Sequence, residues 1–381
     1  MSAPMGSRVI VLAAGGTGGH MFPAEALAGE LLSRGHGVAL ITDRRGGGFG
    51  ERLPAVETHR IAAGGLAGTG IVGRAQGVVQ LGLGFFQARG LLGRLKPAVA
   101  VGFGGYASVP TMLAASLSGV PTVLHEQNAV LGRANRLLAK RATRIATSFS
   151  SVAFIAGSSP GAGGDRAVLT GNPVRPGITV VADQPYAAPS GGGVIQILVV
   201  GGSQGARVFS RLIPEAIALL PAELQRRLRI AQQARAEDLE TARANYAPLA
   251  ATVELAPFFG DMPERLRAAH LVICRSGAST VAELTAAGRP AILIPYPFAT
   301  DDHQTANARA LDTAGAAWLM PEAQTTPSML ADRLASLAAD TERLGRAADV
   351  ARALGRRDAA ARLADLVTSL IRGNGARKEA A

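Results

Sequence analysis

Short runs of consecutive apolar residues alternate along the chain with longer stretches in which apolar positions recur at helical spacing. Uninterrupted runs of Val, Ile and Leu are typical of parallel strands that are buried on both faces by helices. The pattern therefore predicts an α/β protein built on doubly wound parallel sheets. The predicted strands are Arg8–Ala14, Gly37–Thr42, Ala98–Val101, Thr122–Leu124, Ile195–Val200, Leu271–Cys274 and Ala291–Ile294.

Two regions of the chain begin in the same way. Val9–His20 and Ile197–Arg207 each combine an apolar strand, a Gly-Gly-Thr or Gly-Gly-Ser turn and the start of a helix. This repetition indicates two Rossmann-like domains facing each other across a cleft, where the carboxyl ends of both sheets would bind ligands. The stretch 182–193, rich in Gly and Pro, is the predicted linker before the second sheet. We place domains at 1–175 and 176–350, a C-terminal helix that packs back on the first domain at 351–373, and a tail at 374–381.

Composition excludes several classes of protein. With 48% hydrophobic and 18% charged residues among 381, the chain is globular and not disordered. The single cysteine, Cys274, excludes an internal disulfide framework and a multi-cysteine metal site. Glycines and prolines interrupt the uncharged stretch 97–124, which therefore does not predict a membrane span. We expect a soluble or peripheral protein of a reducing cytoplasm.

The positive charge is unevenly distributed. The net charge is +11, almost all of it in the first half of the chain, and no acidic residue lies between Thr58 and His125. Such a surface favours an anionic partner, either a polyanion or an anionic lipid surface. Nucleic acid is not expected, because aromatic residues make up only 4% of the chain and no nucleic-acid-binding module is present.

Three glycine-rich loops, Gly15–His20, Gly102–Ser108 and Gly201–Gly205, follow predicted strands. Such loops bring backbone N–H groups and a helix N-terminus to an anion such as phosphate, although close helix packing alone would also explain any one of them. The dinucleotide fingerprint G-x-G-x-x-G fails at Met21 and Gln204, and no Walker motif is present. NAD is therefore disfavoured, although Asp43, after the second strand, keeps it as a rival.

The stretch Leu271–Ile294 carries the most specific single signal. A polar turn, Arg275–Thr280, follows a strand and leads into a helix with Glu283 in its first turn. The hydroxyl and N–H groups of this turn suit a diphosphate, and Glu283 suits the two hydroxyls of a ribose. A nucleoside diphosphate would satisfy both. A glutamate that only complements the helix dipole is the simpler alternative.

An ordered series of motifs runs from about Val9 to Ala317. The series closely resembles the MurG family of GT-B glycosyltransferases, which add N-acetylglucosamine to the undecaprenyl-diphospho-muramoylpentapeptide precursor of peptidoglycan. The motifs that carry the resemblance are Gly15–His20, Gly104–Ser108, His125–Asn128, Gly171–Arg175, Gly201–Arg207, Arg275–Ala278 and Asp301–Gln304.

The resemblance implies that the second domain binds UDP-N-acetylglucosamine, that the first binds the lipid-linked acceptor, and that the sugar is transferred with inversion. No cofactor and no metal ion are expected, and Asp301–His303 is interpreted as an acid cluster at a helix start. The implied donor-binding residues are Thr17, Gly18, Gly19, Asn128, Arg175, Ser203, Gln204, Phe259, Met262, Arg275, Ser276, Gly277, Ala278, Ser279, Thr280, Glu283 and Gln304. The implied acceptor-binding residues are Gly16, Thr17, Gly18, His20, Tyr106 and Asn128.

Inversion in one displacement needs a base on the attacking hydroxyl and stabilisation of the departing UDP. His20 is the predicted base, since an imidazole titrates near neutral pH, and a hydrogen bond to the acceptor diphosphate is its rival role. Glu126 is the alternative base and Asn128 would orient the acceptor. Both could instead satisfy backbone groups at the end of a strand. For Arg175, phosphate binding and a hinge salt bridge remain equally open.

An apolar segment with a cationic rim predicts contact with a membrane surface. The predicted membrane patch is Ile71, Val78, Val79, Phe85, Phe86, Arg89, Arg136 and Lys140. Arg133, Arg136, Lys140 and Arg144 are predicted to share one face of a helix. A core helix with a solvated basic side would also fit, and Gly82 and Gly84 weaken the amphipathic interpretation. The resemblance implies a peripheral protein on the cytoplasmic face of the bacterial inner membrane, with further partners among cell-wall synthesis proteins.

Two other interpretations remain open at this point. Another GT-B enzyme that uses UDP-N-acetylglucosamine, such as an epimerase, would share the motifs of Arg275–Glu283 but not those of the first domain. A non-enzymatic module that binds anionic lipid would use its glycine loops only for structure.

Overall fold

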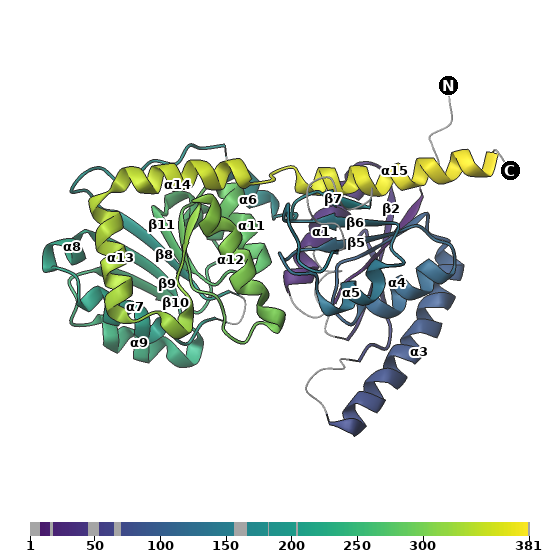
Figure 1. Cartoon of the computed structure of the whole chain (residues 1–381), viewed down its shortest axis with the longest axis horizontal. Helices are drawn as coiled ribbons and strands as arrows, with labels where there is room; N and C mark the ends of the chain where they lie inside the picture. Colours follow the sequence, from purple (N-terminus) through teal and green to yellow (C-terminus); the bar gives the residue numbers. More distant parts are fainter. Residues whose placement is uncertain are drawn as a thin grey trace. The chain divides into compact units, whose positions relative to one another are not determined.

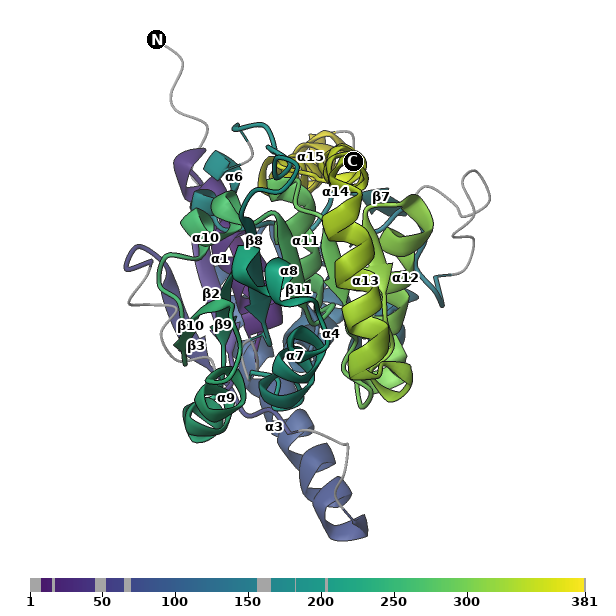
Figure 2. The ribbon, with the colours of Figure 1, turned by 90° about the vertical axis from the view of Figure 1, so that its left-hand side faces the viewer.

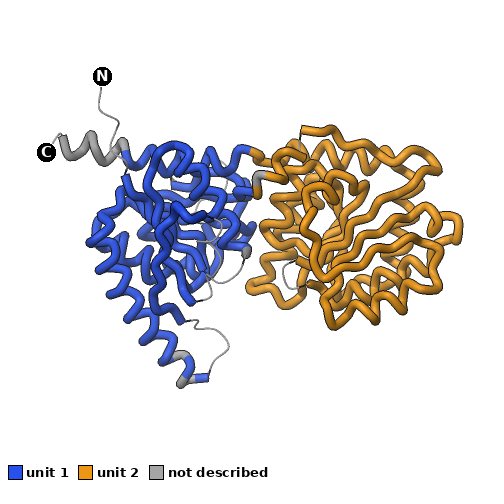
Figure 3. The backbone as a smooth tube through the Cα atoms, turned by 180° about the vertical axis from the view of Figure 1, so that it is seen from behind, with its two compact units in different colours: residues 1–174, 358–381 blue, residues 175–357 orange. Residues whose placement is uncertain are grey.

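The computed structural model describes residues 8–15, 18–44, 53–64, 70–155, 166–181, 183–202 and 205–379, without the side chains of 18, 71, 72, 74, 176 and 372–379. The chain forms two compact units, which are coloured separately in Figure 3. Unit 1 combines Met1–Val174 with Asp358–Ala381, and unit 2 is Arg175–Arg357. The chain thus enters unit 2 once and then returns to unit 1.

Within the described part of unit 1, seven parallel strands form one sheet in the order β3-β2-β1-β4-β5-β6-β7 (Figure 1). The strands are β1 (Val9–Ala13), β2 (Gly37–Thr42), β3 (Glu57–Arg60), β4 (Val99–Gly102), β5 (Thr122–Glu126), β6 (Arg144–Thr147) and β7 (Ala167–Leu169). The helices are α1 (Gly18–Ser33), α3 (Ile71–Leu95), α4 (Ser108–Leu117), α5 (Arg133–Ala139) and α15 (Ala359–Glu379).

Strand β1 shows why helices cover both faces of this sheet. Successive side chains of a strand point to opposite faces. Ile10 and Leu12 join a core cluster with α1 and α15, whereas Val11 and Ala13 join a cluster with α3, α4 and α5. The uninterrupted apolar run of β1 is therefore buried on both sides, as its sequence predicts.

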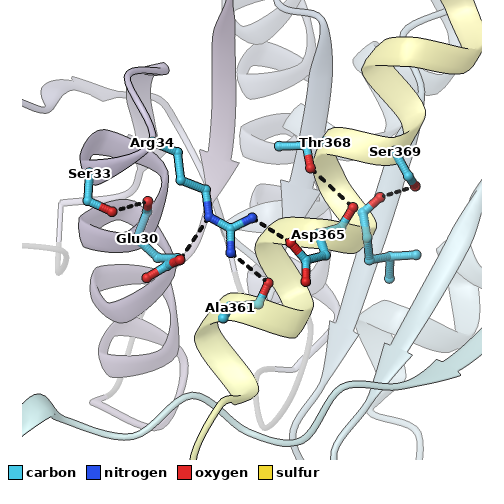
Figure 4. Close-up of polar contacts among 8 residues, drawn as sticks. Glu30, Ser33, Arg34, Ala361, Asp365, Thr368 and Ser369 are labelled. Atoms are coloured by element: carbon cyan, nitrogen blue, oxygen red, sulfur yellow. Dashed lines mark hydrogen bonds and ion pairs between the residues drawn. The ribbon is translucent and has the colours of Figure 1, made fainter.

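The C-terminal helix α15 packs on unit 1. Leu363, Ala364 and Val367 are fully buried against the core that α1 covers. Arg34, in the turn that follows α1, donates hydrogen bonds to Asp365 at 2.6 Å and to the carbonyl oxygen of Ala361 at 3.2 Å (Figure 4). Both apolar packing and polar contacts therefore hold the last helix to the first unit.

In unit 2, the described residues form a six-stranded parallel sheet in the order β10-β9-β8-β11-β12-β13. The strands are β8 (Ile195–Val200), β9 (Leu228–Gln233), β10 (Thr252–Ala256), β11 (Leu271–Cys274), β12 (Ala291–Leu293) and β13 (Ala317–Leu319). The α-helices are α6 (Pro176–Val181), α7 (Phe209–Ala218), α8 (Ala222–Arg227), α9 (Leu239–Tyr246), α10 (Met262–Ala268), α11 (Ala278–Ala287), α12 (His303–Ala314), α13 (Pro327–Ala339) and α14 (Thr341–Leu354).

The core of unit 2 lies between its sheet and the helices α7 and α13 (Figure 2). Ile195, Ile197 and Val199 of β8 contribute to it from one face of the sheet, and Phe209 contributes from α7. Helix α11 packs against α6 and α14. Two parallel-sheet α/β units confirm the predicted fold class. Helix α14 extends to Leu354, and the segment that returns to unit 1 begins a few residues later, at Asp358.

Candidate functional site

His20 lies in the first turn of α1, directly after the loop that follows β1. Its ring packs against the turn after β4. A Cβ atom added at Gly104 would lie 3.3 Å from Cε1 of His20, and one at Gly105 would lie 3.4 Å from Cδ2. Both glycines also have positive φ angles, 87° and 73°, which L side chains rarely adopt. The backbone of this turn therefore favours glycine, and the absence of side chains lets the imidazole lie close to it.

A chain of polar contacts leads from His20 into the protein at the end of β5. Nδ1 of His20 lies 3.2 Å from Oε1 of Gln127, and Nε2 of Gln127 lies 3.0 Å from Nδ1 of His125. Nε2 of His125 in turn lies 3.0 Å from the carbonyl oxygen of Gly171. Burial lowers the pKa of His125 to about 4, with a smaller contribution from the nearby His20 and a partial offset from the hydrogen bond to Gly171, so His125 is neutral at neutral pH.

Glu126 is buried beside this chain and organises the loop that follows β5. Its Oε1 accepts from the backbone N–H and the side-chain amide of Asn128, at 3.0 and 3.3 Å. Its Oε2 accepts from the backbone N–H of Gly132 and from Nδ2 of Asn135, both at 2.8 Å. Four donors thus face the carboxylate. This geometry favours the structural interpretation of Glu126 and Asn128 over a base at Glu126.

The structure describes only some of the other predicted site residues of unit 1. Tyr106 is half-buried and directly follows the Gly104–Gly105 turn, whereas Gly19 is exposed in the first turn of α1. Gly16 and Thr17 lie outside the described residues, and Gly18 is described only as the first residue of α1. The sequence did not single out Gln127 or Asn135. Gln127 was within reach of prediction, since it lies inside the motif His125–Asn128.

In unit 2, the turn after β11 leads into the N-terminus of α11, with Gly277 as its N-cap. The first N–H groups of a helix have no acceptor within it and attract an anion. Among the described side chains, Oγ of Ser279 is buried there without a hydrogen-bond partner. Ala278 and Thr280 lie in the same first turn. The N-terminus of α11 therefore offers donors to a phosphate.

Helix α12 supports this turn from the side. Oγ of Ser276 donates to the carbonyl oxygen of Gln304 at 2.8 Å, and Nδ2 of Asn307 donates to the carbonyl oxygen of Ser276 at 3.0 Å. The side-chain oxygen of Gln304 accepts from the backbone N–H of Tyr296 at 2.9 Å. Two residues in the left-handed region, Asp301 (φ 53°) and Asp302 (φ 50°), begin this segment. Such strain is typical of functional turns, and aspartate tolerates it better than most residues.

Arg275 is buried, and its guanidinium faces acceptors inside unit 2. Nη1 donates to the carbonyl oxygens of Ile294 at 3.1 Å and Pro295 at 3.0 Å, and Nη2 lies 2.6 Å from Oε2 of Glu322. In this structure Arg275 therefore holds the segment after β12 in place. Its predicted contact with the departing diphosphate stays a prediction.

Glu283 and Arg175 contact each other within unit 2. Burial raises the pKa of the Glu283 carboxyl, and the charge and hydrogen bond of Arg175 partly offset that rise. Phe259 is also buried, and the guanidinium of Arg265 lies 3.9 Å from the centre of its ring. Met262 is the first residue of α10. Ser203 and Gln204 lie outside the described residues.

Helix α3 presents an apolar face to solvent. Val78, Val79, Leu83 and Phe86 are 59%, 61%, 55% and 71% exposed. The buried positions of α3 include Gly77, Gly84 and Ala88, and a Cβ atom added at Gly84 would lie 1.9 Å from the carbonyl oxygen of Ala62. Gly84 therefore permits close packing and does not argue against an amphipathic helix. Figures 1 and 2 both show the first turns of α3 extending beyond the body of unit 1.

Several other residues of the predicted membrane patch contact neighbouring residues of unit 1 and are less available to a membrane. Phe85 is half-buried, and its ring meets Phe86 edge to face at 5.4 Å. Arg89 donates to Oγ of Ser118 at 3.2 Å, and the guanidinium of Arg136 lies 4.0 Å from the ring centre of Phe154. The side chain of Ile71 is outside the description. No helix of the described chain combines the length and the apolar character needed to cross a bilayer.

The predicted basic face of one helix is wrong in part. Helix α5 ends at Ala139, Lys140 is its C-cap, and Arg144 begins strand β6. Arg144 pairs with Val123 of β5, so backbone pairing to the sheet overrides the helical spacing of the charges. Among the residues that the structure describes, no three His, Cys, Asp or Glu side chains lie together in a way that could hold a metal ion.

The two parallel-sheet α/β units, together with the similar solved structures of glycosyltransferases, define a protein of the GT-B fold class. The sequence matches the models of the glycosyltransferase family 28 N-terminal domain over residues 10–147 and C-terminal domain over residues 196–363. Within this class, the chain belongs to the MurG family of glycosyltransferase family 28.

Close relatives support this placement along nearly the whole chain. Proteins of Rhodospirillum rubrum and Rhodospirillum centenum are each 57% identical over 94% of this chain, and the matches cover 91% and 93% of their own lengths. Both are named UDP-N-acetylglucosamine–N-acetylmuramyl-(pentapeptide) pyrophosphoryl-undecaprenol N-acetylglucosamine transferase. The crystal structure of Acinetobacter baumannii MurG matches with a TM-score of 0.76 and 31% identity, over 95% of this chain and 99% of that one.

The fold alone is shared more widely. A UDP-GlcNAc 2-epimerase from Neisseria meningitidis matches with a TM-score of 0.65 at 11% identity. A likeness at that identity supports the architecture and does not distinguish a transferase from an epimerase.

Proposed function

We propose that this chain transfers N-acetylglucosamine from UDP-N-acetylglucosamine to the 4-hydroxyl of the muramoyl group of undecaprenyl-diphospho-muramoylpentapeptide. The observation that carries the proposal is the 57% identity, across both units, to proteins named for this transfer. The polar turn at α11 and the placement of His20 in α1 fit the same chemistry.

Unit 2 is the proposed donor-binding unit. The N-terminus of α11, with Ser279 and Thr280, would bind the diphosphate, as the buried Oγ of Ser279 suggests. Glu283 has one oxygen on Arg175, and its other oxygen would accept from the ribose. Gln304 and Ala278 would contact the sugar, and the segment from Phe259 to Met262 would contact the uracil. We further assign Gly277, Ser276, Ser203 and Gln204 to the diphosphate, and Arg275 to support of the segment after β12.

The reaction is a single displacement. The 4-oxygen of the acceptor attacks C1 of the sugar while its proton passes to Nε2 of His20. The bond between C1 and the diphosphate oxygen breaks, and its electron pair leaves with UDP. Donors at the start of α11 stabilise the charge that develops on the diphosphate. One displacement converts the α-linkage of the donor into a β-linkage.

We also propose that unit 1 contacts the anionic cytoplasmic face of the inner membrane, where its lipid-linked acceptor lies. The exposed apolar face of α3 and the positive charge of the first half of the chain support this location. A protein at that surface is also placed to meet other cell-wall synthesis proteins.

The function is tested by following UDP release and glycolipid formation with UDP-N-acetylglucosamine and the lipid-linked muramoyl acceptor. We expect His20→Ala to lower kcat by about 10²- to 10⁴-fold, the usual worth of a general base. His36→Ala, in the turn before β2 of the same unit, is the matched control and should stay within a few-fold of the parent. A parent protein that forms no glycolipid contradicts the function, and a His20→Ala variant that keeps its turnover contradicts the assigned base.

A further inference from the structure

Gln127, at the end of β5, contacts His20, His125 and the backbone after β4. We propose that Gln127 is a positioning residue that keeps the ring proton of His20 on Nδ1, so that Nε2 carries the lone pair that accepts the proton of the sugar hydroxyl. This inference rests on the proposed function for its catalytic meaning. The position of the proton itself follows from the contacts alone.

The first step is the orientation of the Gln127 side-chain amide. Its Nε2 lies 2.9 Å from the carbonyl oxygen of Phe103 and 3.1 Å from that of His125. A carbonyl oxygen only accepts hydrogen bonds, so the amide nitrogen must face these two oxygens. Gln127 is 2% exposed, and this buried position leaves one satisfactory orientation of the amide. Its Oε1 therefore points towards His20.

The second step is the direction of the contact between Gln127 and His20. An amide oxygen also only accepts, so Nδ1 of His20, at 3.2 Å, must be the donor. A neutral imidazole carries one proton, and a proton on Nδ1 leaves the lone pair on Nε2. Nδ1 of His20 is thus the protonated nitrogen, and Nε2 is the basic one.

The contact between His125 and Gly171, at the other end of this series of hydrogen bonds, independently indicates the same direction of donation. The carbonyl oxygen of Gly171 requires a donor, so Nε2 of His125, at 3.0 Å, carries the proton of that ring. His125 is neutral, and its Nδ1 therefore accepts from one of the two N–H bonds of Nε2 of Gln127, at 3.0 Å. The other N–H bond faces the carbonyl oxygens of Phe103 and His125, which share it. Donation runs from His20 through Gln127 and His125 to Gly171. Hydrogen bonds aligned in one direction polarise and strengthen one another.

The tautomer matters because a base with its proton on the wrong nitrogen cannot accept the substrate proton. In enzymes that use a histidine base, the partner of the second ring nitrogen holds the required tautomer, and its loss costs several orders of magnitude in rate. A neutral amide acceptor is a weaker orienting group than a carboxylate. We therefore expect a smaller but measurable effect from the loss of Gln127.

The test compares two substitutions of similar size at this position. Gln127→Met removes the amide. Gln127→Glu keeps an oxygen that accepts from His20 and, when protonated, a hydroxyl that donates to the carbonyl of Phe103. Gln225→Met is the matched control, because Gln225 is also buried and uses both amide atoms, donating to Leu220 at 2.9 Å and accepting from Ala250 at 3.1 Å.

The readout is the ¹H–¹⁵N spectrum of the full chain labelled with ¹⁵N-histidine, which distinguishes a protonated from an unprotonated ring nitrogen. The chain has six histidines, and the signals of His20 are those lost in His20→Asn. We expect His20 to be protonated on Nδ1 above pH 7 in the parent, in Gln127→Glu and in Gln225→Met. In Gln127→Met we expect the proton to move to Nε2 in most molecules, with kcat lowered about 10- to 100-fold and the KM for the donor within a few-fold.

Each outcome decides something. A parent His20 protonated on Nε2, or a Gln127→Met variant with the parent's tautomer, overturns the inference whatever the turnover. A moved proton with undiminished turnover supports the role of Gln127 and removes His20 as the base. A parent without transferase activity contradicts the proposed function, while the tautomer still reports on Gln127.

Discussion

Arg175 and Glu283 form a close ion pair: Nε and Nη2 of Arg175 each lie 2.8 Å from Oε1 of Glu283. Arg175 is the first residue of unit 2, and Glu283 lies in α11. From the sequence both residues were assigned to the donor, and a salt bridge was the open alternative for Arg175. The structure connects the start of the unit to the helix whose N-terminus is the proposed phosphate site.

Removing the arginine tests whether this pair orients Glu283 for the ribose. In Arg175→Met, the buried carboxylate loses its counter-charge, and its pKa, already raised by burial, should rise further. We expect the KM for UDP-N-acetylglucosamine to rise about 5- to 20-fold, equivalent to about 1–2 kcal/mol. Arg357→Met, which removes an ion pair with Asp183 in the same unit, is the control. An unchanged KM in Arg175→Met would show that the pair does not orient Glu283.

The unpartnered hydroxyl of Ser279 predicts an unusual pair of effects. A buried hydroxyl without a partner costs about 1–3 kcal/mol, so Ser279→Ala should leave the ligand-free protein as stable as the parent or more stable. If the hydroxyl binds the diphosphate, the same substitution should reduce the thermal stabilisation by UDP. Ser210→Ala removes another buried, unpartnered hydroxyl, on α7, and should leave the UDP effect unchanged. If UDP stabilises the two variants equally, the hydroxyl of Ser279 does not bind the nucleotide.

The buried His125 predicts a dependence of the stability of unit 1 on pH. Its pKa is about 4 in the folded protein against an ordinary 6.5, so between these values the unfolded chain binds more protons. The contribution of about 3 kcal/mol is complete above pH 6.5 and is lost as the pH falls towards 4. Urea unfolding monitored in unit 1 at pH 7.5 and pH 5 should show about 2 kcal/mol of this loss, because pH 5 still lies above the folded pKa. His125→Phe should show a smaller difference between the two pH values, and His36→Phe should behave like the parent.

The exposed apolar face of α3 predicts binding to anionic vesicles. Val79→Asp combined with Phe86→Asp replaces two exposed apolar side chains with acidic ones, and should lower flotation with phosphatidylglycerol vesicles at least 5-fold. Phe298→Asp changes a side chain of unit 2 that is also highly exposed and serves as the control. High salt should weaken binding of the parent. Equal flotation of the parent and the α3 variant would place the membrane contact elsewhere.

Central strands could be predicted from the sequence, whereas several outer ones could not. The runs that became β1, β2, β8 and β11 are apolar because helices cover both of their faces. The unpredicted β3 reads Glu-Thr-His-Arg and lies at a sheet edge, where pairing to β2 requires backbone groups and little apolar surface. Strand β9, between β8 and β10, alternates buried and exposed residues at its start, so it has no continuous apolar run.

In the candidate site, too, the sequence located the loops but not the contacts that the fold creates. Motifs located His20 and the turn before α11, because loops after parallel strands are where ligands bind. The motif His125–Asn128 includes Gln127, but its role could not be predicted, since its orientation depends on carbonyl groups of Phe103, directly after β4, and of His125 in β5. Arg275 was expected to face a phosphate, but its acceptors Ile294 and Pro295 come from a later segment that only the fold brings close.

The most direct test of the account is the structure of the product, determined by NMR after incubating the full chain with UDP-N-acetylglucosamine and the lipid-linked muramoyl acceptor. We expect stoichiometric UDP and a disaccharide with a β-linkage to the 4-oxygen of the muramoyl group. An α-linked product, a sugar attached at another oxygen, or UDP released with the acceptor unmodified would contradict it.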